Sequence, residues 1–313
     1  MTTYLGSGPY CYTHCLAMMF GDQAPSTAVI ETLTGAPFGV QLVAGRTPYF
    51  DPYGWHPEIG VADAVAALGW RCAHHSGGSE REALDRLLAA GKPVLAGPVD
   101  MGLLAYQTGG GGDHYVLVLA ATEEEVLLHD PHGHPYATLP TKAFLAAWRA
   151  EAVEYVDVPF GMRTDFVRER VVDPVVALRE SLPRAVRWLS GRAEVAVPPG
   201  SLGGAAALLR LAELADRGLE PEVRDLLAHF AIRLGARRLG DAATCLDLLG
   251  MTRAATAATE LARGVGGLQH AVVTGENPVL AQRIAALAPQ YERWLAVLTE
   301  PGAAGATAAP GRG

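Results

Sequence analysis

The chain has 313 residues, of which half are hydrophobic and 19% are charged. This length predicts about two domains, and so apolar a composition excludes wholesale disorder. The formal net charge of −8 argues against a protein that coats nucleic acid, because such proteins place clustered lysine and arginine against phosphates. No apolar run reaches the ~20 residues of a membrane span, so we expect neither nucleic acid nor membrane as a partner.

The cysteines and the first residues indicate a compartment. Met1 to Tyr4 lack the basic and apolar regions of a signal peptide. The four cysteines form no CxxC pair, which argues against a disulfide framework or a zinc ribbon. We therefore expect a cytoplasmic protein with free thiols. The cysteines are Cys11, Cys15, Cys72 and Cys245.

The pattern of predicted elements changes near residue 160. Before it, helical runs (11–20, 61–68 and 80–90) mix with short strand-like runs (93–96, 115–120 and 126–129). After it, apolar residues recur three and four apart almost throughout, in the runs 171–189, 202–216, 222–235, 241–249, 254–262 and 278–299.

The charge changes at the same place. Residues 1–160 carry 17 acidic and 7 basic side chains, whereas the rest carries 16 and 18. The sequence thus predicts an α+β fold: an α+β domain over 1–158, an all-helical domain over 159–300 and a disordered Pro/Gly/Ala-rich tail over 301–313.

Cys11 is the first candidate for chemistry. The turn Gly8-Pro9 leads directly into a helical run, which places Cys11 in the first helical turn. Unpaired backbone N–H groups and the helix dipole favour a thiolate there, as a cysteine nucleophile requires. Cys15, one turn later, is expected to pack as a small apolar residue. The alternative is that both are core cysteines near a helix start.

A hairpin supplies candidates for a base and its partner. Apolar runs on either side of Thr122 to Glu125 predict two antiparallel strands. If the hairpin is centred on Thr122, His114 lies opposite Asp130, and a carboxylate there fixes the imidazole as a base. If the register of the hairpin were shifted by one residue, His129 or Asp113 would take part in this pair instead. An ordinary surface hairpin is the other interpretation.

The order Cys11, His114, Asp130 resembles that of the papain-like cysteine enzymes, and specifically of the bacteriocin-processing peptidase-like branch. In that branch a Cys opens a helix and a Leu follows five positions later, as Leu16 does here. A His opens a strand, and a hairpin ends in Asp-Pro-x-Gly, which residues 130–133 match.

The butirosin biosynthesis protein H family is a closer resemblance. It combines a similar early Cys with a segment containing Phe-Gly, like Phe38-Gly39, and a second, helical domain. The resemblance implies a papain-like catalytic domain that takes an acyl group from an acyl carrier protein and passes it to a small-molecule amine. It implies no cofactor beyond the phosphopantetheine arm that bears the donor thioester.

Two departures concern the oxyanion site. The peptidase branch has a Gln six residues before the nucleophile, where this chain has Leu5, and a Gly after it, where this chain has Tyr12. The Cys11 backbone N–H and a second donor would have to replace the Gln. The candidates for that donor are Tyr10, Gln41 and Gln107. The missing Gln argues against peptidase activity more than against acyl transfer.

The remaining polar features have plainer alternatives. Residues 47–57 are rich in aromatics, and Tyr49 and Trp55 are candidate substrate-binding residues, although a packed loop over the core explains them somewhat better. His129, His132 and His134 could hold a metal, but Asp130 is already needed by His114, so we predict no metal site. Seven arginines within 163–192 suit either a solvated helical face or a surface for an acidic protein.

The sequence therefore predicts a thiol acyltransferase or cyclase of bacterial natural-product biosynthesis, such as antibiotic biosynthesis. Cys11 would be the nucleophile, His114 the base and Asp130 its orienting partner, and an amine or another nucleophile would receive the acyl group. A cysteine peptidase or amide hydrolase with the same triad is the alternative enzyme. A non-catalytic papain-like module that binds a partner is the alternative without catalysis.

Overall fold

The computed structural model describes residues 9–107, 111–192 and 195–300. Leu5 and the predicted tail over 301–313 lie outside these residues. The chain divides into two compact units. Unit 1 contains Met1–Ile30 and Val65–Val171, and unit 2 contains Glu31–Ala64 and Val172–Gly313.

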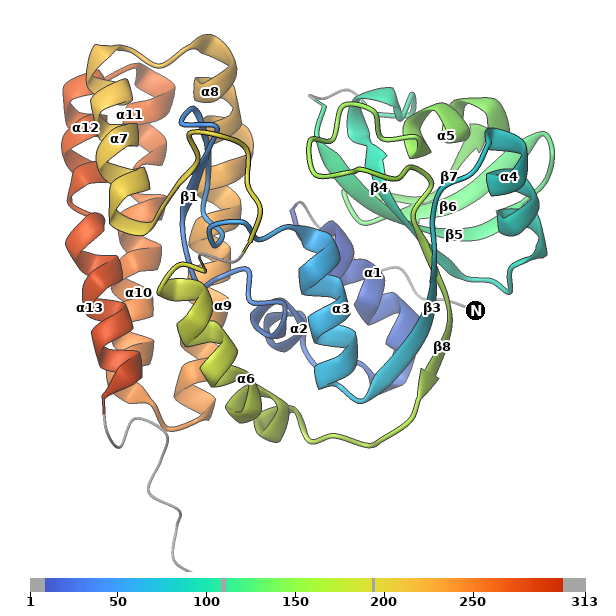
Figure 1. Cartoon of the computed structure of the whole chain (residues 1–313), viewed down its shortest axis with the longest axis horizontal. Helices are drawn as coiled ribbons and strands as arrows, with labels where there is room; N and C mark the ends of the chain where they lie inside the picture. Colours follow the sequence, from blue (N-terminus) through green and yellow to red (C-terminus); the bar gives the residue numbers. More distant parts are fainter. Residues whose placement is uncertain (1–8, 108–110, 193–194, 301–313) are drawn as a thin grey trace, which may run out of the picture. The chain divides into compact units, whose positions relative to one another are not determined.

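Unit 1 is built on a six-stranded antiparallel sheet in the order β3-β8-β4-β5-β6-β7 (Figure 1). Four consecutive strands pair with a sequence neighbour, whereas β8 returns from far along the chain to lie between β3 and β4. The strands are β3 (Trp70–His75), β4 (Val94–Asp100), β5 (Asp113–Ala121), β6 (Glu125–Asp130), β7 (His134–Pro140) and β8 (Met162–Arg168).

Helices complete unit 1. Its core lies between the sheet and two helices, α4 (Glu80–Ala89) and α5 (Thr141–Trp148), where Trp148 and Phe144 pack on buried valines and leucines of β4, β5 and β6. Helix α1 (Cys11–Phe20) packs against β5. Short 3₁₀ turns, η1 (Gly21–Gln23) and η2 (Met101–Leu103), follow α1 and β4.

Unit 2 is mainly helical. Its long helices pack in pairs, α9 on α10 and α7 on α12, with α13 against both α7 and α10 (Figure 1). The helices are α6 (Pro174–Leu189), α7 (Gly204–Arg217), α8 (Pro221–Leu226), the π-helical turn η3 (Leu227–Ala231), α9 (Ile232–Leu248), α10 (Thr252–Gly266), α11 (Gln269–Thr274), α12 (Asn277–Ala285) and α13 (Ala288–Thr299).

A three-stranded sheet joins distant parts of unit 2. Its order is β2-β1-β9, so an early segment pairs with one that precedes α7. The strands are β1 (Gln41–Val43), β2 (Thr47–Tyr49) and β9 (Leu202–Gly203). Helices α2 (Thr27–Leu33) and α3 (Pro57–Ala67) each span a point where the chain passes between the units.

A buried ionic network holds residues 31–64 within unit 2. Arg238 of α9 donates from Nε to Glu31 Oε1 at 2.8 Å and from a terminal nitrogen to Asp51 Oδ2 at 3.0 Å. All three side chains are buried. Phe38 stacks on Trp294 of α13 with ring centroids 5.2 Å apart. Removing one partner of such a pair is costly, because the other charge stays buried.

The coarse fold class agrees with the prediction from the sequence. The division of the chain into units, however, differs from the predicted domains. The structure has antiparallel sheets and a helical C-terminal region, as predicted. However, residues 31–64 belong to the helical unit, and the later boundary lies at 171/172 and not at 158/159. The physical reason for the later boundary is β8, which lies past residue 158 yet pairs with β3 and β4. None of the helices among the described residues is long and apolar enough to cross a bilayer.

Candidate active site

Cys11 is the first residue of α1 and is only partly buried. The first N–H groups of a helix have no partner within it, so they and the helix dipole favour negative charge at this position. The preceding residue, Tyr10, has a φ of 115° and a ψ of 35° although it is not a glycine. Such backbone strain costs about 1–3 kcal/mol and is concentrated at functional sites.

His114 lies near the start of β5, opposite Val99 of β4. Its side chain is buried, and its Nε2 lies 2.7 Å from Oδ1 of Asp130, the last residue of β6. Asp130 is fully buried. Asp130 occupies Nε2, and Cys11 acts on the same imidazole through its charge and as a hydrogen-bond partner. The structure thus brings together the three residues that the sequence proposes as a triad.

The predicted hairpin register is wrong, although the contact that it was meant to produce exists. Leu117 lies opposite His129, and a bulge follows between Val118 and Ala120. If the pairing of Leu117 with His129 continues by one residue, Asp130 lies opposite Val116. His114 and Asp130 are therefore diagonal neighbours and are not directly opposed. The turn lies later than predicted because Thr122 Oγ1 accepts the N–H groups of residues 124 and 125. The register differs by an even number of residues, so Asp130 keeps the same face.

The contacts within the triad influence the protonation of His114 and Asp130. Burial lowers the pKa of His114, but the charges and hydrogen bonds of Cys11 and Asp130 outweigh burial and raise that pKa to about 10. Burial raises the pKa of Asp130, but hydrogen bonds from neighbours that include His114 hold it below its usual range. A protonated imidazole between an ionised carboxylate and a sulfur atom is the charge arrangement of an activated cysteine.

Asp130 has two further donors that the sequence analysis did not identify. The Tyr106 hydroxyl donates to Oδ2 at 3.0 Å, and the backbone N–H of His132 donates to Oδ1 at 2.7 Å. Tyr106 lies in the loop between η2 and β5, and no sequence motif marks it. The Asp-Pro-x-Gly turn does provide a signal for the His132 N–H, because an Asp commonly accepts the N–H two residues later.

Two other cysteines are in environments that disfavour ionisation. Cys15 is fully buried, and burial together with the nearby charges of Cys11 and Asp130 raises its pKa well above the usual value. Burial likewise raises the pKa of Cys245 to about 11. Cys72 of β3 is partly buried, as Cys11 is.

The three candidates for a second oxyanion donor have different surroundings. Tyr10 is buried at the start of α1 with its ring against that of His14. Gln107 donates weakly to the Met101 carbonyl, at 3.4 Å. Gln41 belongs to unit 2, where its amide nitrogen donates to Asp51 Oδ1 at 2.7 Å.

The Gln41 amide has further partners within unit 2. Its nitrogen also donates to the Trp55 carbonyl, and its oxygen accepts the Gly54 N–H. The Gln41 amide therefore stabilises the loop around Asp51 through these hydrogen bonds. Its donors are already used for that purpose.

The aromatic segment 47–57 also packs within unit 2. Trp55 is buried, donates from Nε1 to the Thr34 carbonyl at 2.9 Å and lies under the Arg238 guanidinium. Tyr49 ends β2 opposite Gln41. For Trp55 the structure shows the packed-loop alternative.

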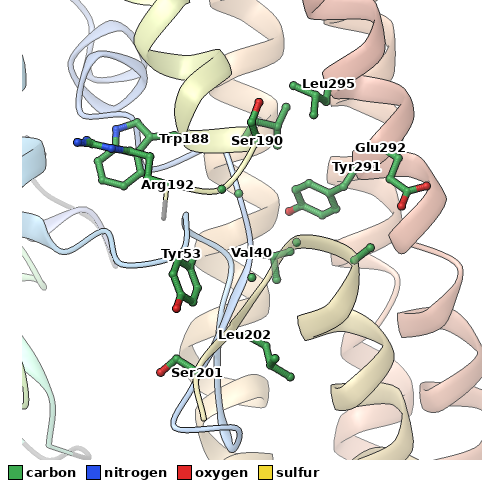
Figure 2. A pocket seen from close by; sticks show the side chains of 16 residues that line it. Val40, Tyr53, Trp188, Ser190, Arg192, Ser201, Leu202, Tyr291, Glu292 and Leu295 are labelled. Atoms are coloured by element: carbon green, nitrogen blue, oxygen red, sulfur yellow. The ribbon is translucent and has the colours of Figure 1, made fainter. Parts of the chain in front are cut away.

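A cavity of about 600 Å³ occurs in unit 2, and Tyr53 of the same aromatic segment is one of the residues that line it. Figure 2 shows Tyr53, Trp188 and Tyr291 among its walls. It is also lined by Arg192, whose guanidinium lies 4.5 Å from the ring centre of Trp188. None of the triad residues lines this cavity.

Histidines of the histidine-rich turn, and Arg184 among the arginines, have contacts within their own units. His129 Nδ1 accepts the Tyr136 N–H, and the His134 ring packs against that of Tyr106. Within the described ranges, no group of three or more His, Cys, Asp or Glu side chains is arranged to hold a metal ion. Arg184 of α6 pairs with Asp63 of α3 at 3.3 Å, so this arginine contacts another helix of unit 2.

One comparison with known proteins concerns the helical unit, and a second covers half of the chain. A family model described as the YobF C-terminal domain matches residues 198–299, which include α7 to α13 and none of the triad residues. The uncharacterized protein YobF of Bacillus subtilis (strain 168) is 32% identical over 164 residues, which are 50% of this chain and 53% of that protein. The chain thus aligns with about half the length of the curated relative it matches. Residues 198–299 are similar to the YobF C-terminal domain.

Proposed function

We propose that this protein is a cysteine-dependent acyl-transfer enzyme with Cys11 as nucleophile, His114 as general acid and base, and Asp130 as the carboxylate that orients His114. The observation that carries the proposal is the buried 2.7 Å contact between His114 Nε2 and Asp130 Oδ1, on a histidine that also hydrogen-bonds Cys11. A nucleophile, a base within reach and a third group that orients the base are the general signature of covalent catalysis.

The arrangement of the elements supports a papain-like catalytic unit. The nucleophile opens a helix that packs against the strand bearing the histidine, and the carboxylate follows on the next antiparallel strand. Fold similarity alone does not define a reaction, so the proposal depends on the side-chain geometry. The strained Tyr10 next to the nucleophile is a second feature that favours a functional site over a packed helix start.

In the first proposed step, the Cys11 sulfur attacks the carbonyl carbon of an acyl thioester. The oxyanion of the tetrahedral intermediate accepts hydrogen bonds from backbone N–H groups at the start of α1. When the intermediate collapses, the carbon–sulfur bond to the donor breaks and the departing thiolate takes a proton from the His114 imidazolium. The products are a free donor thiol, a neutral imidazole and an acyl group on Cys11.

In the second step, an acceptor amine attacks the Cys11 thioester while neutral His114 removes a proton from the nitrogen. Collapse of the second intermediate forms an amide and regenerates the Cys11 thiolate beside a His114 imidazolium. The site therefore returns to its starting charges, and Asp130 stabilises the imidazolium at both ends of the cycle.

The donor and acceptor follow from the family resemblance. A thioester on the phosphopantetheine arm of an acyl carrier protein is the proposed donor, and a small-molecule amine is the proposed acceptor in bacterial natural-product biosynthesis. Leu5, at the position of the peptidase glutamine, disfavours amide hydrolysis as the main reaction. The hydrolase and the non-catalytic module are the outcomes that the experiment below separates from transfer.

The test uses acetyl-N-acetylcysteamine, a small thioester, with intact-mass detection of the full chain. We expect the wild type to gain one acetyl group and Cys11→Ala to gain none. Cys72→Ala is the matched control, because Cys72 is also a partly buried thiol but lies outside the triad. A simple primary amine should then discharge the acetyl group as an amide.

The other outcomes are distinct. Discharge to water alone, together with cleavage of a peptide amide, would assign hydrolysis. A wild type that gains no acetyl group and whose Cys11 is no more reactive than Cys72 would leave the non-catalytic module as the better interpretation. An adduct that survives in Cys11→Ala would contradict the proposed nucleophile.

A further inference from the structure

The Asp130 carboxylate is held at both oxygens. Oδ1 faces His114 Nε2 and also accepts the N–H of His132, each at 2.7 Å. Oδ2 accepts the hydroxyl of Tyr106 at 3.0 Å. Asp130 is fully buried, so an oxygen that lost its donor inside unit 1 would pay a large desolvation cost.

We propose that Tyr106 is a positioning residue of the triad, which fixes the plane of the Asp130 carboxylate and keeps it ionised; this inference rests on the proposed function. A carboxylate can rotate about its Cβ–Cγ bond, and a donor on Oδ2 opposes that rotation. The rotation matters because Oδ1 sets the direction of the His114 ring. Tyr106 thus acts on Cys11 only through Asp130 and His114.

The surroundings of Tyr106 suit this role. Its ring lies against that of His134 with centroids 5.2 Å apart, so the β6–β7 turn supports the ring that carries the hydroxyl. Burial and the neighbouring Asp130 raise the pKa of Tyr106, which keeps the phenol a neutral donor. The same hydrogen bond contributes to the lowered pKa of Asp130.

The direction of the pH effect follows from these contacts. Without the Tyr106 hydroxyl, Asp130 is protonated at a higher pH, and a neutral Asp130 stabilises the His114 imidazolium less. The Cys15 thiol does not titrate in the acid range, because burial raises its pKa. Titratable side chains around Asp130 include His114, Tyr106 and Cys15, which interact with it, and His129, His132 and His134, which adjoin its turn; Cys11 interacts with His114.

The experiment measures the rate of Cys11 alkylation by iodoacetamide as a function of pH in the full chain. We expect Tyr106→Phe to move the acid limb of this profile upward by about one pH unit, because a hydrogen bond to a charged group is lost. Tyr155→Phe is the matched control: the Tyr155 hydroxyl donates to Asp113 at 2.8 Å, so it removes a similar bond beside the triad. Its profile should coincide with that of the wild type.

A double-mutant comparison provides the second readout. In an Asp130→Asn background, Tyr106→Phe should produce no further shift of the limb, because Tyr106 acts through the carboxylate. A limb that is unchanged in Tyr106→Phe, or shifted equally in Tyr155→Phe, would overturn the inference while leaving the triad intact. A wild type whose Cys11 reacts like Cys72 at every pH would instead contradict the proposed function itself.

Discussion

The four residues of the candidate site come from distant parts of the sequence but lie within one unit. Cys11 is on a helix, His114 and Asp130 are on neighbouring strands, and Tyr106 is in a loop. The raised pKa of His114 has a consequence for stability. Because this pKa exceeds the ordinary value of 6.5, protonation of His114 stabilises the folded protein. This contribution to stability is fully present below about pH 6.5 and is lost as pH rises through about 10.

The coupling between Cys11 and His114 gives a prediction at this scale. Cys11→Ala removes the sulfur charge and hydrogen bond that raise the pKa of His114, while burial continues to lower it. We expect His114 to titrate about 1–3 units lower in the variant. The measurement is ¹H–¹⁵N NMR of the histidine rings, with His114→Ala to assign the signal. Identical titrations in the two proteins would mean that Cys11 and His114 do not form an ion pair.

At the scale of elements, the agreement between sequence and structure depends on the kind of element. The helix at 11–20 is predicted and found, because a turn and an apolar run mark its start. Strands β3 and β8 are missed, since both are rich in charged or half-exposed residues and lack clear alternation. The triad residues could be proposed from order and motif. The register and Tyr106 could not, because a bulge and a loop contact leave no pattern in the sequence.

Alanine substitutions at two glycines of α9 test how closely residues 31–64 pack on this helix. A Cβ at Gly235 would overlap Cβ of Phe50, whereas a Cβ at Gly240 meets nothing within 4 Å. Alanine favours a helix over glycine by about 1 kcal/mol, and overpacking costs about 1–3 kcal/mol. We expect Gly240→Ala to stabilise the protein by up to about 1 kcal/mol and Gly235→Ala to destabilise it.

Urea unfolding, followed by circular dichroism, measures both glycine variants. Gly240→Ala also shows whether the helix-propensity gain is realised in α9 at all. If Gly235→Ala were as stable as Gly240→Ala, the close packing between α9 and residues 31–64 would be disproved.

At the scale of the whole molecule, each unit is made from two separate stretches of chain. Residues 31–64 belong to unit 2, although the stretches before and after them, 1–30 and 65–171, belong to unit 1. A boundary read along the sequence assumes one continuous stretch per domain, which is why the predicted boundary at 158/159 differs from the structure. The match to the YobF C-terminal domain at 198–299 likewise omits the partners of Arg238.

This organisation predicts that the C-terminal stretch does not fold alone. A fragment of residues 172–300 would leave Arg238 without Glu31 and Asp51 and would expose Trp294. An unpaired buried charge costs about 3–5 kcal/mol, a large part of a domain's stability. We expect no cooperative thermal transition by near-ultraviolet circular dichroism. The control joins residues 31–64 to the fragment by a flexible linker and should restore the transition. Cooperative unfolding of the fragment without 31–64 would contradict this view of unit 2.

The central claim is that Cys11, activated by His114 and Asp130, carries the acyl group. The most direct measurement is peptide mapping of the protein after exposure to acetyl-N-acetylcysteamine, in the wild type and in His114→Ala. The account predicts one acetyl group, on Cys11, whose formation slows at least about a hundredfold without His114. Acetylation of Cys15 or Cys72 in place of Cys11, or an equal rate in the two proteins, would contradict it.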